Sequence, residues 1–324
     1  MRKPEAPPAS AAGQEQAADA AAAIFRPLLP RLFGIAYRMR GSVAEAEDIV
    51  QDAYLRWHAT EIATIRDPSA FLSTVVTRLC LDQLKSARTR RETYVGPWLP
   101  EPILEGLPAD AAEEASDPHD VSVALILALE RLSPLERAAF LLHDIFGLSF
   151  DEVATALDRE VVACRQLAAR ARKNVRAARP RFAVAPDDGM RIADAFFEAS
   201  RSGDHAALRS LLAEDVVSYT DGGGRKPAAI NPIRGVDKVT AFFAGLARKV
   251  AGRKPHLLHK GSINALPGFV TIETGEVLQT TALEIVDGRI AAIYIAKPRE
   301  AAPYLAALRG QRLSRGVRST ISAP

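Results

Sequence analysis

A run of basic and amide side chains between residues 159 and 181 has the chemistry needed to bind nucleic acid. Eight Lys or Arg residues fall in this run against a single acid, Glu160. Cations neutralise phosphates, and Arg or Gln side chains also donate hydrogen bonds to base edges. The residues that we predict to contact DNA here are Arg165, Gln166, Arg170, Arg172, Lys173 and Arg176. A solvated basic helix would carry the same charges, so the surrounding elements must distinguish the two.

A second group of side chains, in the last third of the chain, has the chemistry of acid–base catalysis. Its members are Asp221, His256, His259, Lys260, Glu273 and Tyr294. Nothing in their spacing indicates a particular reaction, and outward positions on strands explain them equally well. The glycine-rich segment that follows Asp221 lacks the Gly-Lys-Ser/Thr ending and the helix of a phosphate-binding loop. We therefore predict that the protein is not an enzyme, with no catalytic residue, metal site or cofactor.

The basic run ends a pattern typical of a helix-turn-helix. A first helix is predicted from about Pro134 to Phe146, and Ser149 with Glu152 forms a capping box that begins a short second helix. After a turn, a third helix places its apolar residues on one side at helical spacing. These residues are Val161, Cys164, Leu167, Ala168, Ala171 and Val175. In such a motif the N-terminal part of the last helix reaches base edges, so Arg165 and Gln166 are the best candidates for readout.

An earlier helical region, from about Ile24 to Thr93, carries two differently charged surfaces. Ser42 and Glu45 form a further capping box. The helix that follows buries Ala46, Ile49, Val50, Ala53 and Trp57 and exposes an acidic, polar face with Asp48, Gln51 and Asp52. Asp67 caps the next helix, whose exposed side is expected to carry Thr77, Arg78, Lys85, Arg88, Arg90 and Arg91. The acidic face suits a protein partner and the basic one suits nucleic acid.

The overall composition restricts the class of protein. With 42 Lys and Arg against 39 Asp and Glu among 324 residues, the net charge is only +3, so the basic charge is local. The two cysteines, Cys80 and Cys164, sit at apolar helical positions, which favours buried thiols over a disulfide or a metal site. No apolar run reaches the length of a membrane span and no secretion signal is present, so we predict a cytoplasmic protein. Residues 1–20 resemble a disordered tail.

A negatively charged linker is expected at residues 96–120. Its five prolines favour an extended chain, and 24 residues at about 3.3 Å each could span roughly 80 Å. Trp98, Leu99 and Pro100 are too apolar for a solvated tether, so we expect them to dock on another part of the protein. The alternative is that Trp98 caps the neighbouring helical domain.

The chain from residue 187 to 300 has the pattern of an α+β cone. Two helices precede a strand near Val216–Thr220, and a further helix leads into four β-rich runs between His256 and Ala296. Helices followed by a meander of strands are typical of an NTF2-like or SnoaL-like fold, which encloses a pocket for a small-molecule ligand. Residues 301–324 form a basic tail that is expected to be mobile.

Several stretches resemble the extracytoplasmic-function (ECF) sigma factors of bacterial RNA polymerase. These are AEAEDIVQDAYLRW, PSAFLSTVVTRLCLDQLKSARTRRE, LSPLERAAFLLHDIFGLSFDEVATAL and ACRQLAARAR, in that order. WLPEP at 98–102 and DGGGRK at 221–226 further resemble the SigJ-like (ECF41) group, which has a fused SnoaL-like domain. Glu160 stands where these factors commonly have a serine cap. The resemblance divides the chain into region two (21–95), a linker (96–120), region four (121–182) and a SnoaL-like domain (187–300).

The resemblance implies a function and roles for the residues above. Asp48, Gln51 and Asp52 would bind the clamp helices of core RNA polymerase. Arg78, Lys85, Arg88, Arg90 and Arg91 would bind DNA at the minus-ten element. The last helix of region four would bind the minus-thirty-five element, and region four would also contact the polymerase flap. The loop of Asp221, Gly222, Gly223 and Gly224 would make regulatory contacts in cis, either with region two or with the linker that holds Trp98, Leu99 and Pro100. The free protein is expected to be a monomer. A ligand-sensing DNA-binding regulator that does not bind polymerase is the alternative.

Overall fold

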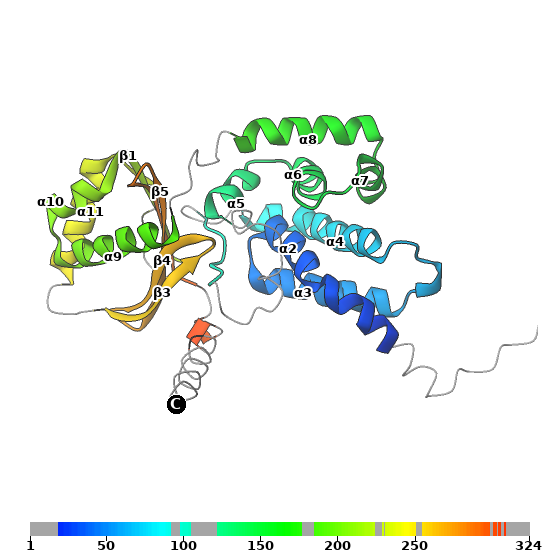
Figure 1. Cartoon of the computed structure of the whole chain (residues 1–324), viewed down its shortest axis with the longest axis horizontal. Helices are drawn as coiled ribbons and strands as arrows, with labels where there is room; N and C mark the ends of the chain where they lie inside the picture. Colours follow the sequence, from blue (N-terminus) through cyan, green and yellow to red (C-terminus); the bar gives the residue numbers. More distant parts are fainter. Residues whose placement is uncertain are drawn as a thin grey trace, which may run out of the picture.

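The computed structural model describes residues 19–91, 98–104, 122–176, 185–223, 229, 231–250 and 255–298, with residues 301, 302, 304, 305 and 308. The protein has two halves that lie side by side (Figure 1). One half is all α and runs from α2 to α8, and the other is α+β and runs from α9 to β6. This is the fold class that the sequence predicted. None of the described helices has the length and apolar character needed to cross a membrane.

Three helices form the N-terminal part of the all-α half. They are α2 (Leu29–Arg40), α3 (Val43–His58) and α4 (Pro68–Arg91), with the 3-10 turns η1 (Arg26–Leu28) and η2 (Ile62–Thr64). The predicted inner face of α3 is fully buried around Trp57. Asp67 caps α4 by accepting the Ala70 N–H at 3.0 Å. Thr77 is buried, so its predicted exposure was wrong; its hydroxyl donates to the Ser73 carbonyl at 2.7 Å, which satisfies it inside the helix.

Only one of the two hydrogen bonds of the predicted capping box forms at the start of α3. The Ser42 hydroxyl accepts from the Glu45 N–H, but the Glu45 carboxylate pairs instead with buried Arg40 at 2.8 Å. Glu101 of the linker takes its place, since its Oε2 accepts from the Val43 N–H at 2.8 Å and from the Ser42 hydroxyl at 3.1 Å. The first turn of α3 is therefore capped by a residue far away in the sequence.

The remaining helices of this half form the helix-turn-helix. They are α5 (Val123–Glu130), α6 (Pro134–Phe140), the π-helical turn η4 (Leu141–Ile145), α7 (Phe150–Leu157) and α8 (Val161–Arg176). The predicted first helix corresponds to α6 with η4. The predicted capping box before α7 is complete: Ser149 N–H donates to the Glu152 carboxylate at 2.7 Å, and Glu152 N–H donates to the Ser149 hydroxyl at 3.3 Å. Helix α5 was not predicted.

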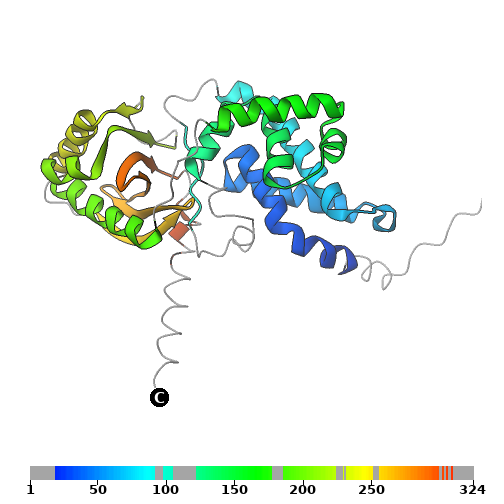
Figure 2. The same cartoon turned by 45° about the horizontal axis from the view of Figure 1, so that its top comes forward.

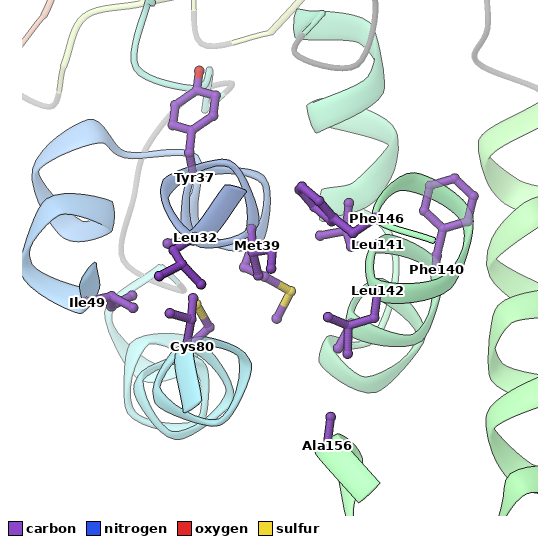
Figure 3. Packing of buried hydrophobic residues seen from close by; sticks show 14 of the residues in the cluster. Leu32, Tyr37, Met39, Ile49, Cys80, Phe140, Leu141, Leu142, Phe146 and Ala156 are labelled. Atoms are coloured by element: carbon purple, nitrogen blue, oxygen red, sulfur yellow. The ribbon is translucent and has the colours of Figure 1, made fainter. Parts of the chain in front are cut away.

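One hydrophobic core joins the two groups of helices. Leu32 and Met39 of α2 and Cys80 of α4 belong to the same buried cluster as Leu141 and Leu142 of η4, and Figure 3 shows the two groups facing one another. The length of the predicted linker would allow the two helical regions to separate. The structure instead has them packed together, since the apolar stripe of each provides the burial that the other requires.

The α+β half is a curved six-stranded sheet with three helices. Its elements are α9 (Pro186–Ser202), α10 (His205–Leu211), β1 (Leu212–Asp221), β2 (Ile233–Arg234), α11 (Val236–Lys249), β3 (His256–Ile263), β4 (Leu266–Glu273), β5 (Val277–Val286) and β6 (Arg289–Ala296). The strand order is β2-β1-β6-β5-β4-β3. The β3 to β6 meander is antiparallel as predicted, whereas the parallel pairing of β1 with β6 was not predicted.

The two faces of this sheet have different partners. The helices cover one face, around Phe196, Phe243 and Phe269, and they lie on the side away from the all-α half (Figure 2). The other face contacts the linker and the start of α5. Tyr304 and Leu308 were expected to lie in a mobile tail, but both are buried against this second face, where their apolar side chains are removed from water.

Candidate nucleic-acid interface

Helix α8 presents one face to the core and the opposite face to solvent. Its buried side is made of Cys164, Ala168, Ala171 and Val175, which pack in the shared core. The helix runs along the outer edge of the all-α half (Figure 1). The opposite side is exposed, and we call it the α8 ridge. The α8 ridge consists of Val162, Arg165, Gln166, Ala169 and Lys173.

The basic side chains predicted on α8 do not all have the same surroundings. Arg170 pairs with Glu136 of α6 at 2.7 Å, and Arg172 pairs with Asp144 at 2.6 Å. Arg165 lies over the Phe150 ring at 5.6 Å from its centroid. Arg165, on the α8 ridge, is therefore better placed to receive DNA than Arg170 and Arg172, which flank the ridge. Gln166 and Lys173 are the other ridge members of the predicted set, and the Arg176 side chain lies outside the described residues.

The acidic face of α3 is open to solvent. Asp48, Gln51 and Asp52 are all exposed on this face, and Gln51 and Asp52 lie one turn after Asp48. Leu55, which the sequence analysis did not single out, continues this face and is 59% exposed. Its position three residues after Asp52 is a signal that could have found it, because such spacing keeps side chains on one side of a helix. The exposed face of α3 therefore combines two carboxylates, an amide and one apolar side chain.

The basic face predicted on α4 is partly engaged within the protein. The Arg78 guanidinium donates to the carbonyls of Thr155 at 2.7 Å and Ala156 at 3.1 Å, in the last turn of α7. A cation at that position satisfies carbonyls that the helix leaves free at its end. Lys85, Arg88, Arg90 and Arg91 continue α4, but their side chains lie outside the described residues.

Residues Trp98–Leu104 run between the two halves and contact both, and we call them the strap. On the helical side, Trp98 lies against Gly41, where a Cβ would come within 2.2 Å of its ring. Gly41 also has a φ of +71°, so the chain turns there in a conformation that glycine adopts without strain. On the other side, Leu99 and Pro100 are buried, and Leu99 N–H donates to the Asp221 carboxylate at 2.9 Å.

Asn264 is a second point of attachment for the strap. It occupies the β3–β4 turn, where its φ of 49° is one that Asn tolerates. Its side-chain amide donates to the Tyr37 hydroxyl at 2.7 Å, and its Oδ1 accepts the Ile103 N–H at 3.0 Å. The Tyr37 hydroxyl in turn donates to the Glu101 carbonyl at 2.7 Å, and burial raises the Tyr37 pKa. The network therefore joins α2, the strap and the sheet.

The glycine-rich loop after β1 begins at this junction. Asp221 is buried, and its second carboxylate oxygen accepts the Gly223 N–H at 2.7 Å, which folds the loop back onto its first residue. Gly222 follows directly, and Gly224 lies outside the described residues. Asp221 thus bonds both to the strap and to its own loop.

Comparison with known proteins identifies the family. Sigma-70 region 2 matches residues 24–90, and Sigma-70 region 4 matches residues 122–175. The chain is 41% identical to the ECF RNA polymerase sigma factor SigJ of Mycobacterium tuberculosis over 285 residues, or 85% of this chain and 91% of the relative. The chain is an ECF sigma factor. Members of this family direct core RNA polymerase to promoters and are not enzymes, and nothing in the comparisons supports the alternative of a polymerase-independent regulator.

Two further comparisons agree with this assignment. The crystal structure of M. tuberculosis SigJ superposes on the sigma factor with a TM-score of 0.70 at 35% identity and covers 88% of this chain and 98% of its own. The probable ECF sigma factor SigI of the same species is 37% identical over 210 residues, covering 63% of this chain and 70% of the relative. The match to SigJ includes the α+β half, so this half belongs to the shared architecture.

The acid–base groups of the sigma factor are dispersed over its sheet. Glu273 is held by a bidentate pair with Arg201 at 2.6 and 3.0 Å, and Lys260 pairs with Asp194 at 2.6 Å. The remaining predicted groups are His256, which is exposed, and His259 and Tyr294, which are not. Among the described residues, no three His, Cys, Asp or Glu side chains are grouped to hold a metal ion.

Tyr294 shows how the second face of the sheet uses its polar groups. Its hydroxyl donates to the Glu284 carboxylate at 2.6 Å, and its ring stacks on Tyr219. Burial raises the pKa of Glu284, and the hydrogen bond from Tyr294 partly opposes this. This is a satisfied buried pair on the face that contacts the linker, not in the interior between sheet and helices. That interior is lined by Phe196, Phe243 and other buried apolar side chains.

Proposed function

We propose that this sigma factor binds core polymerase through the acidic face of α3 and reads a two-part promoter with its two helical regions. Asp48, Gln51, Asp52 and Leu55 form the polymerase-binding face. The α8 ridge enters the major groove of the minus-thirty-five element, and the basic side of α4, from Arg78 onward, binds the minus-ten element. The exposed positions of the α3 face and the α8 ridge support this division of roles.

The packed arrangement of the helical regions corresponds to a closed state of the free protein. Two promoter elements some 25 base pairs apart are separated by about 85 Å at 3.4 Å per step. A single hydrophobic core of α2 to α8 cannot span that distance, so the two regions must separate on the promoter. Arg78, which holds the end of α7, must release it when α4 binds DNA.

The α+β half keeps the sigma factor closed, and the strap is the observation that carries this part of the proposal. The sheet bonds to the strap through Asp221 and Asn264. It also packs against Val123, at the start of α5, in a common apolar cluster with Leu99. The α+β half thus contacts both helical regions at once. Its release would leave them joined through residues 105–121, long enough to let them move apart.

Further features follow from this proposal. We expect the free protein to be a monomer, since the sheet face that contacts the strap and α5 is covered within the same chain. It acts in the cytoplasm, where polymerase and promoters are found. A small-molecule ligand of the cone would act by altering the contact between sheet and strap.

Multi-round in vitro transcription with purified core polymerase and a pooled genomic template tests the proposal. The native chain is compared with the Asn264→Gly variant, which keeps the positive φ and the backbone bond to the Ile103 carbonyl but loses the side-chain bonds to Tyr37 and Ile103. The matched control is Glu276→Gly, at the β4–β5 turn with φ of 58°. We expect specific transcripts from all three proteins and a severalfold higher yield from Asn264→Gly.

A chain ending near Ala185 extends the same test. Without the α+β half it should bind core polymerase at least as well as the native chain and give more transcript. Equal yields from native and Asn264→Gly proteins, with a truncated chain no more active, would contradict regulation by the α+β half. Absence of transcripts and of core binding from every variant would contradict the sigma-factor roles assigned to α3, α4 and α8.

A further inference from the structure

Val162 is an exposed apolar side chain at a position where the structure gives no reason for one. It is 63% exposed, more than any other large apolar side chain that the structure describes. Valine is also a poorer helix former than alanine because its branched Cβ loses rotamer freedom in a helix. Neither packing nor helix propensity therefore accounts for a valine in the first turn of α8.

The direction of Val162 is fixed by the helix. Val162 and Ala171 are nine residues apart, or about two and a half turns, so they lie on opposite sides of α8. Ala171 is completely buried, which places Val162 in the middle of the α8 ridge. Arg165 and Gln166 come one turn later on the same side and are exposed, as is Lys173 beyond them.

The surroundings of Val162 favour nucleic acid over an apolar protein surface. Arg165 and Lys173 share its ridge, and the flanking Arg170 and Arg172 are each paired with a carboxylate. The α3 face that we propose to bind protein has its exposed leucine among carboxylates, whereas Val162 lies among cations and an amide. A ridge with one branched apolar side chain among cations and an amide matches the major groove, where the thymine C5-methyl is the apolar group on the base edges.

We infer that Val162 contacts the C5-methyl group of a thymine in the major groove and so sets the base preference of the α8 ridge. The inference rests on the proposed function, since it assumes that this ridge reads the minus-thirty-five element. The stiff χ1 of valine holds its two methyl groups in one orientation, so the contact needs little ordering on binding. Arg165 and Gln166 supply hydrogen bonds to the neighbouring base pairs, and Val162 adds a preference that hydrogen bonds alone do not give.

Replacement of thymine by deoxyuridine removes this methyl group and nothing else, which gives a direct test. The holoenzyme, made from the full chain and core polymerase, is first used to select duplexes from a randomised pool. Each thymine of the selected upstream element is then replaced singly by deoxyuridine, and the Kd of the holoenzyme is measured. We expect one or two positions at which the native protein binds about fourfold more weakly, as for the loss of one buried methyl-sized contact.

The same series is measured with two variants of the chain. Val162→Ala should lose the sensitivity to deoxyuridine while binding the parent duplex severalfold more weakly. Asn174→Ala, also exposed on α8 but off the ridge, should behave as the native protein does. Alanine is a better helix former than either residue, so both variants should fold, and thermal unfolding checks this.

Three results would overturn the inference. In the first, the native holoenzyme binds and transcribes normally but no thymine shows methyl sensitivity. In the second, Val162→Ala retains that sensitivity, which would assign it to another residue. In the third, Val162→Ala weakens binding to core polymerase and leaves the base preference unchanged, which would make the ridge a protein-binding surface. Loss of core binding by the native chain would instead contradict the proposed function itself, and the inference with it.

Discussion

Arginines serve two different purposes at the inner surface, where the two helical regions meet, and at the outer surface formed by the α8 ridge. On the inner surface, where region four meets region two, they bond to backbone carbonyls across the boundary. Arg31 donates to the Phe146 carbonyl at 2.7 Å, Arg78 donates to the end of α7, and buried Arg137 donates to the Met39 carbonyl. On the outer surface, by contrast, Arg165 is exposed on the α8 ridge.

The arginines bonded to carbonyls maintain the closed state, whereas the exposed Arg165 is available to bind DNA. A guanidinium bonded to carbonyls in a buried interface cannot leave without exposing them, so it resists separation of the two regions. A guanidinium on the ridge loses little when DNA replaces water around it and gains by releasing counterions. Substitution of an inner arginine should therefore lower stability more than DNA binding. Substitution of a ridge arginine should weaken DNA binding more than stability.

The largest effect is expected from Arg137→Met. Arg137 also bonds to the Leu129 carbonyl at 3.0 Å and to Glu130 at 2.7 Å, so its loss leaves several buried acceptors without this donor. We expect a loss of about 3 kcal/mol in the free energy of unfolding, measured in urea. The same change on the ridge, Arg165→Met, should cost about 0.5 kcal/mol or less but weaken promoter binding. Equal destabilisation by both variants would remove the distinction between the two surfaces.

A smaller effect is expected from Arg78→Ala, which removes both hydrogen bonds to the end of α7. The contact is only partly buried, so we estimate a cost of about 1 kcal/mol to the closed state, or a roughly fivefold larger open fraction. Spin labels at His58→Cys in α3 and Asn174→Cys in α8, both exposed, would report it as a larger share of long distances. Arg78→Lys should shift the distribution less, because one donor remains. An unchanged distribution would show that Arg78 does not maintain the closed state.

The sequence was informative where structure depends on neighbouring residues. The complete capping box of Ser149 and Glu152, the helical spacing around Cys164 and the β3 to β6 meander all involve contacts within a few residues or between adjacent strands. Such signals determine the type and limits of an element. They therefore predicted the helix-turn-helix and the α+β cone. They also predicted the buried thiol of Cys80 on α4, whose pKa burial raises to about 12.

The remaining features depend on contacts between distant residues. Arg78 and Arg165 both follow apolar helical patterns, and nothing local reveals that Arg78 bonds to the end of α7 while Arg165 is exposed on the α8 ridge. Glu101 caps α3 across 58 residues in place of Glu45, which local reasoning had chosen. Val162 is different, because its position opposite the apolar stripe of α8 was visible in the sequence and could have placed it among the ridge residues.

The smallest effect is expected at Glu136 of α6, which pairs with Arg170 beside the α8 ridge. The hydrogen bond from Arg170, and then that from Ser133, lowers the Glu136 pKa below its usual value. A carboxyl group with a lowered pKa in the folded protein contributes stability above its unfolded pKa, and this contribution disappears as the pH falls through the lower folded value. Glu136→Gln preserves the capping box, since glutamine also serves at that position, but removes the charge.

Glu136→Gln should therefore change the free energy of unfolding at neutral pH by about 0.5 kcal/mol or less, and the difference from the native protein should vanish in acid below the usual glutamate range. At neutral pH it should also release Arg170, which would bring a further cation to the edge of the α8 ridge and strengthen duplex binding slightly. Salt titration of the Kd would detect this as a slope steeper by nearly one counterion. An unchanged slope would mean that Arg170 stays away from the phosphates even when its partner is neutral, and that DNA contact on α8 is confined to the ridge.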